Sequence, residues 1–178
     1  MLEDKLLLWK LKRGDTDALR RIYEKYKNDL LALAISLSND RTTAEDVLHD
    51  VFVSFAQIAS KLQLRTSLKS YLSSCIANRI RSLQSIKVRQ IVQLNDTTSS
   101  EHDYNEPARE AMSAELHEQI EAVLSELPYQ QREVIILHLN SHIRFKEIAK
   151  TQGVSINTIQ SRYRYGLEKL KSQLNGKV

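Results

Sequence analysis

One segment near the middle of the chain has little apolar surface to bury, and this limits how the 178 residues can fold. The segment QLNDTTSSEHDYNEPAREA, residues 93–111, is poor in aliphatic side chains and rich in Ser, Thr, Asn and acidic residues. Such a composition is typical of a linker between domains. We therefore expect two domains, residues 1–92 and 112–178, joined by a flexible acidic linker over residues 93–111.

Both domains are expected to be helical. The chain has only four glycines and two prolines, and Leu, Ile, Ala, Lys, Glu and Gln recur at helical spacing, with few strand-like alternations. Hydrophobic residues make up 42% of the sequence, which is enough for packed cores and argues against general disorder. The sequence thus predicts an all-α protein of two small helical domains.

The charges are distributed unevenly. Residues 1–90 hold 16 basic and 10 acidic residues, residues 91–115 hold 1 and 6, and residues 116–178 hold 9 and 6. No Asp or Glu occurs between Asp50 and Asp96, although this interval contains seven Lys and Arg residues. One sign of charge sustained over more than forty residues indicates a polyanionic partner.

The first domain has three predicted amphipathic helices, over residues 15–37, from Thr42 or Thr43 to about residue 59, and over residues 67–89. A Thr hydroxyl at the start of the second helix would cap it. Helical spacing in this second helix gathers Phe52 and Phe55 on the inner side and turns Asp46, Asp50 and Val53 outward.

The third predicted helix has a buried and an exposed side. Leu72, Ile76, Ile80 and Leu83 form its inner stripe. The outer line contains no carboxylate and combines an aromatic ring, an amide, hydroxyls and guanidinium groups, namely Tyr71, Ser74, Asn78, Arg81, Ser85 and Arg89. These groups stack on bases and bind phosphates, although an ordinary solvent-exposed face is the competing interpretation.

The second domain is predicted to contain helices over residues 112–127 and 130–139 and a short helix containing FKEIAKTQ. A turn at Gly153 and a final helix over residues 156–174 follow. This is the signature of a helix-turn-helix. Gly153 would end the first helix in the left-handed conformation, Val154 would fill the space between the helices, and Ser155 would cap the second.

The final helix is expected to pack with one side and bind duplex DNA with the other. Ile159, Tyr163, Gly166, Leu170 and Leu174 share the inner side. A helix in the major groove contacts base edges from its first turns and phosphates from its rim. Candidates for base contacts are Asn157, Gln160, Ser161 and Arg164, and candidates for phosphate contacts are Thr158, Arg162 and Tyr165.

Taken together, the segments GDTDALRRIYEKYKNDLLALA, AEDVLHDVF, SYLSSCIANRI, LPYQQREVIIL and FKEIAKTQGVSINTIQSRYRYGLEKLK resemble, in order, the sigma-70 family of bacterial RNA polymerase subunits. The resemblance is to the small extracytoplasmic function (ECF) group, which has two conserved domains. It covers nearly the whole chain and implies a specificity subunit without catalytic activity.

The resemblance also implies a role for each domain. The first would dock on the clamp helices of the largest subunit of core RNA polymerase, with Asp46, His49, Asp50 and Val53 as candidate contacts. It would also bind the melted minus-ten element through Lys61, Arg65, Tyr71, Ser74, Asn78, Arg79, Arg81 and Arg89. The second would read the minus-thirty-five duplex through Ser155, Asn157, Thr158, Gln160, Ser161, Arg162, Arg164 and Tyr165.

Some positions depart from the family pattern. Tyr71 stands where a tryptophan is usual, His49 replaces a glutamine, and Arg144 occupies the place where a serine often caps the first helix of the DNA-reading pair. Few arginines follow Asn78. These departures bear on the promoter bases that are recognised more than on the role.

Two other functions are compatible with parts of this pattern. The main alternative is a free-standing helix-turn-helix regulator that binds operator DNA as a dimer, and a third is an adaptor without nucleic-acid affinity. The histidines are scattered, no phosphate-binding loop occurs, and His138 and His142 lack a third ligand, so neither an enzyme, a metal site nor a cofactor is expected.

The compartment and further partners follow from similar considerations. Cys75 stands alone and forms no internal disulfide. The apolar runs are too short to span a membrane, and MLEDKLLLWKLKRGD is typical of an amphipathic helix rather than a secretion signal, so a cytoplasmic protein is expected. Whether an anti-sigma factor is a further partner stays open at this point.

Overall fold

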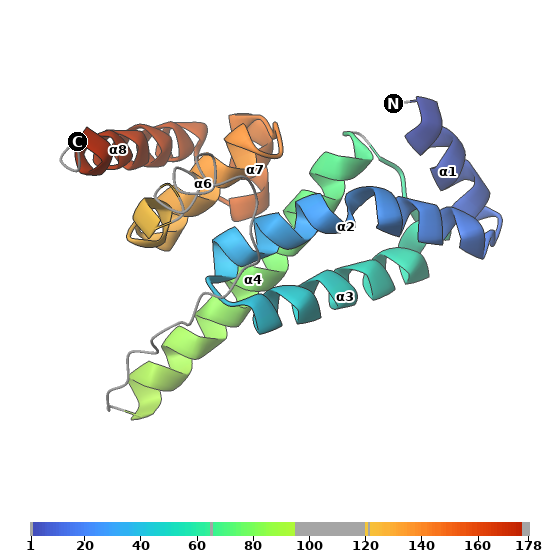
Figure 1. Cartoon of the computed structure of the whole chain (residues 1–178), viewed down its shortest axis with the longest axis horizontal. Helices are drawn as coiled ribbons and strands as arrows, with labels where there is room; N and C mark the ends of the chain where they lie inside the picture. The colour runs from blue at the N-terminus through green and yellow to red at the C-terminus, as the bar shows by residue number, and fades with distance from the viewer. Residues whose placement is uncertain (1, 65, 95–119, 121, 176–178) are drawn as a thin grey trace, which may run out of the picture. The chain divides into compact units, whose positions relative to one another are not determined.

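The structure is a computed structural model that describes residues 2–64, 66–94, 120 and 122–175, with only the backbone described for residues 87–94 and 175. All regular structure in these residues is helical, as Figure 1 shows, which confirms the predicted all-α class. The chain forms two compact units, Met1–Leu83 and Gln84–Val178.

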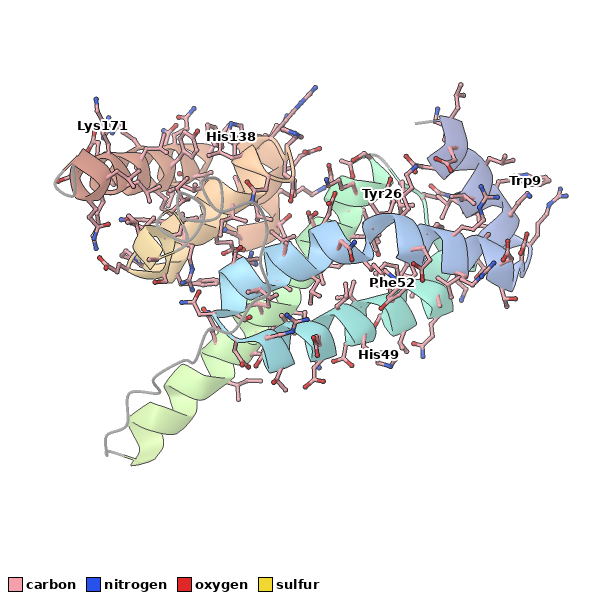
Figure 2. The ribbon with its side chains drawn as sticks, viewed as in Figure 1. Trp9, Tyr26, His49, Phe52, His138 and Lys171 are labelled. Carbon is pink, nitrogen blue, oxygen red and sulfur yellow. The ribbon has the colours of Figure 1, made fainter. Side chains whose placement is uncertain are left out.

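Unit 1 is built around an antiparallel pair of helices (Figure 1). Its elements are α1 (Leu2–Lys12), α2 (Thr16–Ser38), α3 (Arg41–Ile58), the 3-10 turn η1 (Ala59–Lys61) and the first part of α4 (Leu68–Leu94). Helix α2 packs against both α1 and α3, and α1 also contacts η1. Figure 2 shows Phe52 between α2 and α3, with His49 pointing away from α2.

Capping residues set where the first helices begin. The Asp15 carboxylate accepts hydrogen bonds from the backbone amides of Asp17 and Ala18, so α2 starts where the sequence predicts. For α3, the prediction that Thr42 or Thr43 caps the helix is wrong. The carboxylate of Asp40 accepts from the Thr43 amide at 2.9 Å, and the helix begins at Arg41, one or two residues earlier than predicted.

The core of unit 1 follows the predicted helical stripes. Phe52 and Phe55 are buried from α3, and Leu72, Ile76 and Ile80 are buried from α4, whereas Leu83 is half-buried. Burial of each such side chain contributes roughly 1.5–3 kcal/mol relative to exposure. This packing fixes which side of α3 and of α4 faces solvent.

Helix α4 continues to Leu94, past residue 89, where the pattern predicts its end. The first two residues of the predicted linker are therefore helical, and residues 95–111 lie outside the described part of the chain. Of the helix predicted over residues 112–127, residues 120 and 122–127 are described; residues 120 and 122–125 are helical, whereas residues 126 and 127 lie in a turn and a bend.

Unit 2 contains α6 (Tyr129–Leu139), α7 (Phe145–Gln152) and α8 (Ile156–Asn175). Pro128 precedes the first of these helices, as predicted, because proline lacks the amide that a helix interior requires. Helix α8 packs on α6 and α7. Ile136, Ile143, Ile148 and Ile159 are almost completely buried between these elements.

A close approach of α8 to α6 depends on Gly166. A Cβ atom built there would lie 2.6 Å from the Ile135 Cδ1 and 3.3 Å from the Gln131 Cβ. Because Ile135 is buried, it has little room to withdraw. The missing side chain at residue 166 thus sets the position of α8.

Candidate nucleic-acid interface

The turn between α7 and α8 has the geometry that the sequence predicts. Gly153 has φ 67°, the left-handed conformation, and the Val154 amide donates to the Ala149 carbonyl at 3.1 Å. The Ser155 hydroxyl accepts from the Thr158 amide at 3.0 Å, which caps α8. The helix-turn-helix is confirmed, with Gly153 ending α7 and Ser155 capping the start of α8.

Helix α8 has one buried and one exposed face. Ile159, Gly166 and Leu170 are buried, while Asn157, Gln160 and Arg164 are exposed. Within the described residues, neither Asn157 nor Gln160 has a side-chain hydrogen bond. The Arg164 guanidinium lies over the Tyr165 ring, 5.0 Å from its centroid, where it stays accessible. Amide and guanidinium groups are the kinds of group that can hydrogen-bond to base edges.

The flank of α8 has structural contacts as well. Thr158, Ser161 and Arg162 are only half exposed. Arg162 Nη1 donates to Gln152 Oε1 at 2.7 Å, which ties α8 to the end of α7. The Thr158 and Ser155 hydroxyls are 2.9 Å apart. Arg162 therefore helps to hold the helix pair together and Thr158 contacts the cap of α8, and both also line the rim of the pair.

The first helix of this pair begins without a serine. Arg144 lies at its N-cap position, and the Arg144 amide donates to Glu147 Oε2 at 3.2 Å. The carboxylate of Glu147 thus satisfies a backbone amide at the cap position. The start of α7 is set by Glu147 despite the unusual residue at 144.

The outer side of α4 carries the second group of predicted contacts. Asn78 is exposed, and its Oδ1 accepts from Arg81 Nη1 at 3.0 Å. Ser74 is half-buried, and its hydroxyl donates to the Ser70 carbonyl at 2.8 Å. Lys61, at the end of η1, is exposed. Arg65 and the side chain of Arg89 lie outside the described part of the chain.

Tyr71 is half-buried rather than fully exposed. Its ring lies 6.3 Å from that of Phe55, centroid to centroid, and its hydroxyl interacts with the Cys75 thiol one turn later. Burial is the main reason that the pKa of Tyr71 rises to about 12, and burial also raises the pKa of Cys75. Part of the ring remains accessible for stacking on a base.

Arg79 is already paired in the structure. Its Nη2 lies 2.8 Å from Asp50 Oδ2 of α3, and both side chains are about half exposed. The sequence assigns Arg79 to nucleic acid and Asp50 to the polymerase. The fold therefore joins one residue of each predicted site in a single ion pair.

The predicted polymerase contacts form one exposed patch on α3. Asp46, His49, Asp50 and Val53 are all exposed, and their spacing places them on one side of the helix. Figure 2 shows His49 projecting to solvent from this side. The patch combines two carboxylates with an apolar residue and is opposite the buried Phe55.

Sequence reasoning missed two features of these surfaces. Ile156, the first residue of α8, is 43% exposed beside Asn157, where an apolar side chain could contact a thymine methyl group. Lys69 pairs with Asp29 of α2 and so is partly neutralised. The position of Ile156 directly after a cap was visible in the sequence, whereas the Lys69 pairing depends on residues forty positions apart.

The histidines that lie four apart have separate environments. The His138 ring stacks near Phe145 and Tyr163, and its Nδ1 is 2.9 Å from the Ile143 carbonyl oxygen. His142 is exposed with φ 53°. The described residues contain no group of three potential metal ligands. None of the helices described is both long and apolar enough to cross a membrane.

Two family models match the sequence. The model for Sigma-70 region 2 matches residues 22–85, and the model for Sigma-70, region 4 matches residues 117–170. Region 2 thus covers most of α2, all of α3 and the first part of α4. Region 4 covers α6, α7 and most of α8. Together the two matches span more than half of the chain.

Similar proteins include the ECF RNA polymerase sigma factor EcfG of Rhodopseudomonas palustris (strain TIE-1). It is 28% identical over 159 residues, which cover 89% of this chain and 86% of EcfG. The ECF RNA polymerase sigma factor SigM of Bacillus subtilis (strain 168) is 25% identical over 154 residues, which cover 86% of this chain and 93% of SigM.

Solved structures show the same fold. The sigma factor RpoE of Bartonella quintana, in complex with the anti-sigma factor NepR, has a TM-score of 0.73 at 22% identity and covers 88% of this chain and 96% of its own. CnrH, in complex with the cytosolic domain of CnrY, has a TM-score of 0.68 at 20% identity and covers 99% of each chain. With both sigma-70 regions matched in order and ECF sigma factors among its relatives, the chain belongs to the sigma-70 family of RNA polymerase sigma factors, in the ECF group.

Proposed function

We propose that this sigma factor binds core RNA polymerase and directs initiation at promoters that it recognises through two separate surfaces. The observation that carries the proposal is that each sigma region presents an exposed polar face opposite a buried apolar one. On α8 the exposed face holds Asn157, Gln160 and Arg164, and on α4 it holds Asn78. The domain boundaries at residues 92 and 112 are part of the proposal.

The α8 face suits duplex DNA. An α-helix fits the major groove, where Asn, Gln and Arg distinguish bases by paired hydrogen bonds. Because the start of α8 is capped and packed, Asn157 and Gln160 have fixed positions on its exposed side. We assign this face to the minus-thirty-five element, with Ser155, Thr158, Ser161, Arg162 and Tyr165 completing the contact.

The α4 face suits a melted strand. A half-exposed Tyr71 ring offers a stacking platform, and Arg79 and Arg81 supply cations around it. Stacking in DNA is worth on the order of 1.4 kcal/mol per base-pair step, so bases captured on this face would recover part of the energy of melting. We assign it to the minus-ten element, with Lys61, Arg65, Ser74, Asn78 and Arg89 as further contacts.

The α3 patch suits a protein partner. Asp46 and Asp50 offer two carboxylates one turn apart, and Val53 adds an exposed apolar contact beside them. We assign this patch, together with His49, to the clamp helices of the largest polymerase subunit. The protein then acts in the cytoplasm with no catalytic group or cofactor of its own, because the polymerase supplies the chemistry.

An inhibitory partner is a further part of the proposal. The RpoE structure contains an anti-sigma factor, and this chain adopts the same fold. We infer that an anti-sigma factor would restrain this protein by covering the surfaces that bind polymerase and promoter.

The test is transcription by core RNA polymerase on genomic fragments with and without the purified protein. The proposal predicts new transcripts with defined start sites, which decline when Asp46 and Asp50 are both changed to Asn. A free-standing regulator, the alternative function, would bind operator fragments tightly and support no initiation by core polymerase.

A further inference from the structure

Helix α1 is firmly held on unit 1. Leu7 is 2% exposed, and Asp4 Oδ1 accepts hydrogen bonds from the Tyr26 hydroxyl and from Lys25 Nζ, each at 2.8 Å. Lys25 Nζ also lies 2.6 Å from Glu3. Both acidic residues of α1 are thereby engaged with α2, so α1 is an integral part of the unit.

The opposite side of α1 is apolar as well. Leu2, Leu6 and Trp9 are 86%, 54% and 49% exposed, and Figure 2 shows Trp9 projecting away from α2. The Arg13 guanidinium lies 3.9 Å from the centroid of the Trp9 ring. A helix that is apolar on two sides is normally covered on both. We refer to Leu2, Leu6 and Trp9 of α1, together with Arg13 in the turn that follows, as the outer face of α1.

The spacing of the outer face matches a helix-pairing seam. Its residues are separated by four, three and four positions, which is the 3.5-residue repeat through which two helices pack side by side. Trp and Arg are also the residue types that most often dominate binding energy at protein interfaces. A bilayer surface does not require this repeat, so the spacing favours a helix as the occupant.

The charges beside the seam indicate what kind of helix would bind there. Lys5 and Lys12 are exposed on one flank, and Lys10 lies on the other. Glu3, the acidic residue beside the seam, is paired with Lys25. Flanking residues of opposite charge select the partner of a coiled coil. An occupant with Glu or Asp at its flanking positions would therefore be complementary to this face.

Three other occupants fit less well. A second copy of the chain would place lysines against lysines. The acidic segment over residues 93–111 lacks regularly spaced aliphatic residues with which to fill the seam. The third occupant is the polymerase or the promoter. The sigma-70 region 2 match begins only at residue 22, and none of the residues assigned above to polymerase or promoter lies on α1.

We propose that the outer face of α1 is a docking site for an acidic amphipathic helix of a partner protein. The site is separate from the surfaces proposed for the polymerase and for DNA, and it does not depend on them. Binding buries the three apolar side chains of the face and places the partner's carboxylates beside Lys5, Lys12 and Arg13.

The probe is a synthetic helix of about four heptads with Leu at the seam positions and Glu at the flanking positions. The Glu side chains keep the peptide from pairing with itself. Trp9 is the only tryptophan in the chain, so its fluorescence reports on the outer face directly. We expect saturable binding to the full-length protein with a blue shift of the Trp9 emission, and no binding of the same peptide with Lys at its flanks.

Variants of exposed residues locate the site. Leu6→Glu is expected to weaken binding of the Glu peptide about tenfold or more. Leu139→Glu, at an exposed apolar residue of unit 2, is the matched control and is expected to leave binding unchanged. The double variant Lys5→Glu, Lys12→Glu is expected to reverse the peptide preference, so that it binds the Lys peptide rather than the Glu peptide. Circular dichroism checks that each variant is folded.

Four outcomes would overturn the proposal. The first two are failure of the folded protein to bind the Glu peptide and equal binding of both peptides. A shift of Trp9 emission only with vesicles containing phosphatidylglycerol would assign the face to a membrane surface. A concentration-dependent dimer that Leu6→Glu abolishes would assign it to a second copy. Transcription with core polymerase is measured separately, and its result does not bear on the peptide titration.

Discussion

The two proposed nucleic-acid surfaces differ in what their side chains do before any partner arrives. On α8, Asn157 and Gln160 have no side-chain hydrogen bond within the described residues, and Arg164 rests on an exposed ring. On α4, Arg79 is paired with Asp50, Asn78 accepts from Arg81, and Tyr71 is half-buried. Although Arg162 on its flank is bonded to Gln152, the base-contact candidates on α8 would bind without giving up side-chain hydrogen bonds to the described part of the chain, whereas the α4 surface would exchange internal contacts for DNA contacts.

This difference suits the two targets. A duplex presents its base edges in a fixed groove, so a rigid, preformed helix loses little on binding. A melted strand exists only after the duplex has opened. Because Asp50 lies in the patch assigned to the polymerase, binding of the polymerase would release Arg79 for the strand. If both assignments hold, docking on the enzyme and capture of the minus-ten element would be coupled through the Arg79–Asp50 pair.

The largest effect is expected from destabilising unit 1, which carries the α4 surface. Phe55→Ala leaves a cavity beside Phe52 and Tyr71 and should lower the free energy of unfolding of unit 1 by about 3–5 kcal/mol. Urea unfolding followed by Trp9 fluorescence measures this, since Trp9 lies in unit 1. Ile136→Ala in unit 2 is the control. An equal shift of the Trp9 transition by both variants would show that the units unfold as one.

A smaller effect is expected on the α8 surface. Arg164→Ala should cost about 1–3 kcal/mol of binding and relax specificity at one base pair, because a guanidinium reads a base through paired hydrogen bonds. Binding is measured on a set of minus-thirty-five duplexes with each position replaced in turn. Arg162→Ala should instead weaken all duplexes alike. A uniform loss for Arg164→Ala would reassign it to a phosphate.

The ion pair on unit 1 offers a finer test. Asp50→Asn should raise the affinity of the free protein for single-stranded DNA about two- to fivefold, since an exposed ion pair is worth up to ~1 kcal/mol. Asp46→Asn removes the same charge one turn away without releasing Arg79 and is the matched control. Affinity is measured by fluorescence anisotropy with a labelled strand. Equal gains in both variants would mean that only net charge had changed.

The smallest effect concerns pH. An unfolded tyrosine ionises near 10, whereas the pKa of Tyr71 and that of Tyr26 are each raised to about 12, mainly by burial. Between these values the unfolded state binds fewer protons, so the stability of unit 1 should fall as pH rises from 10 to 12. Tyr71→Phe should make this fall shallower in Trp9-monitored unfolding. The effect is small because the Tyr71 ring is partly in water, and an unchanged slope would contradict it.

The helix-turn-helix was predictable because local signals agree there. Gly153 ends α7, Ser155 caps α8, and apolar residues at helical spacing select the buried face. The start of α3 was missed because Asp40 and Thr43 both have side chains that can cap a helix. In the structure the Asp40 carboxylate accepts the hydrogen bond from the Thr43 amide. The end of α4 was missed because no Gly or Pro marks it.

The composition of the exposed faces was predictable, but their internal pairing was not. Helical spacing placed Asn78, Asp50 and Arg164 outward, as observed. The Arg79–Asp50 pair joins residues twenty-nine positions apart on different helices, so it depends on how α3 and α4 pack. The half-burial of Tyr71 depends on the same packing. Spacing within one helix contains no information about either.

The most direct test of the account compares how core RNA polymerase changes the affinity of this sigma factor for two probes, taken from a promoter mapped by transcription. One is the minus-thirty-five duplex, and the other is the single strand of the minus-ten element. The account predicts that core polymerase raises affinity for the strand by a much larger factor than affinity for the duplex. Equal factors for the two probes would contradict it, because they would mean that both surfaces are equally prepared in the free protein.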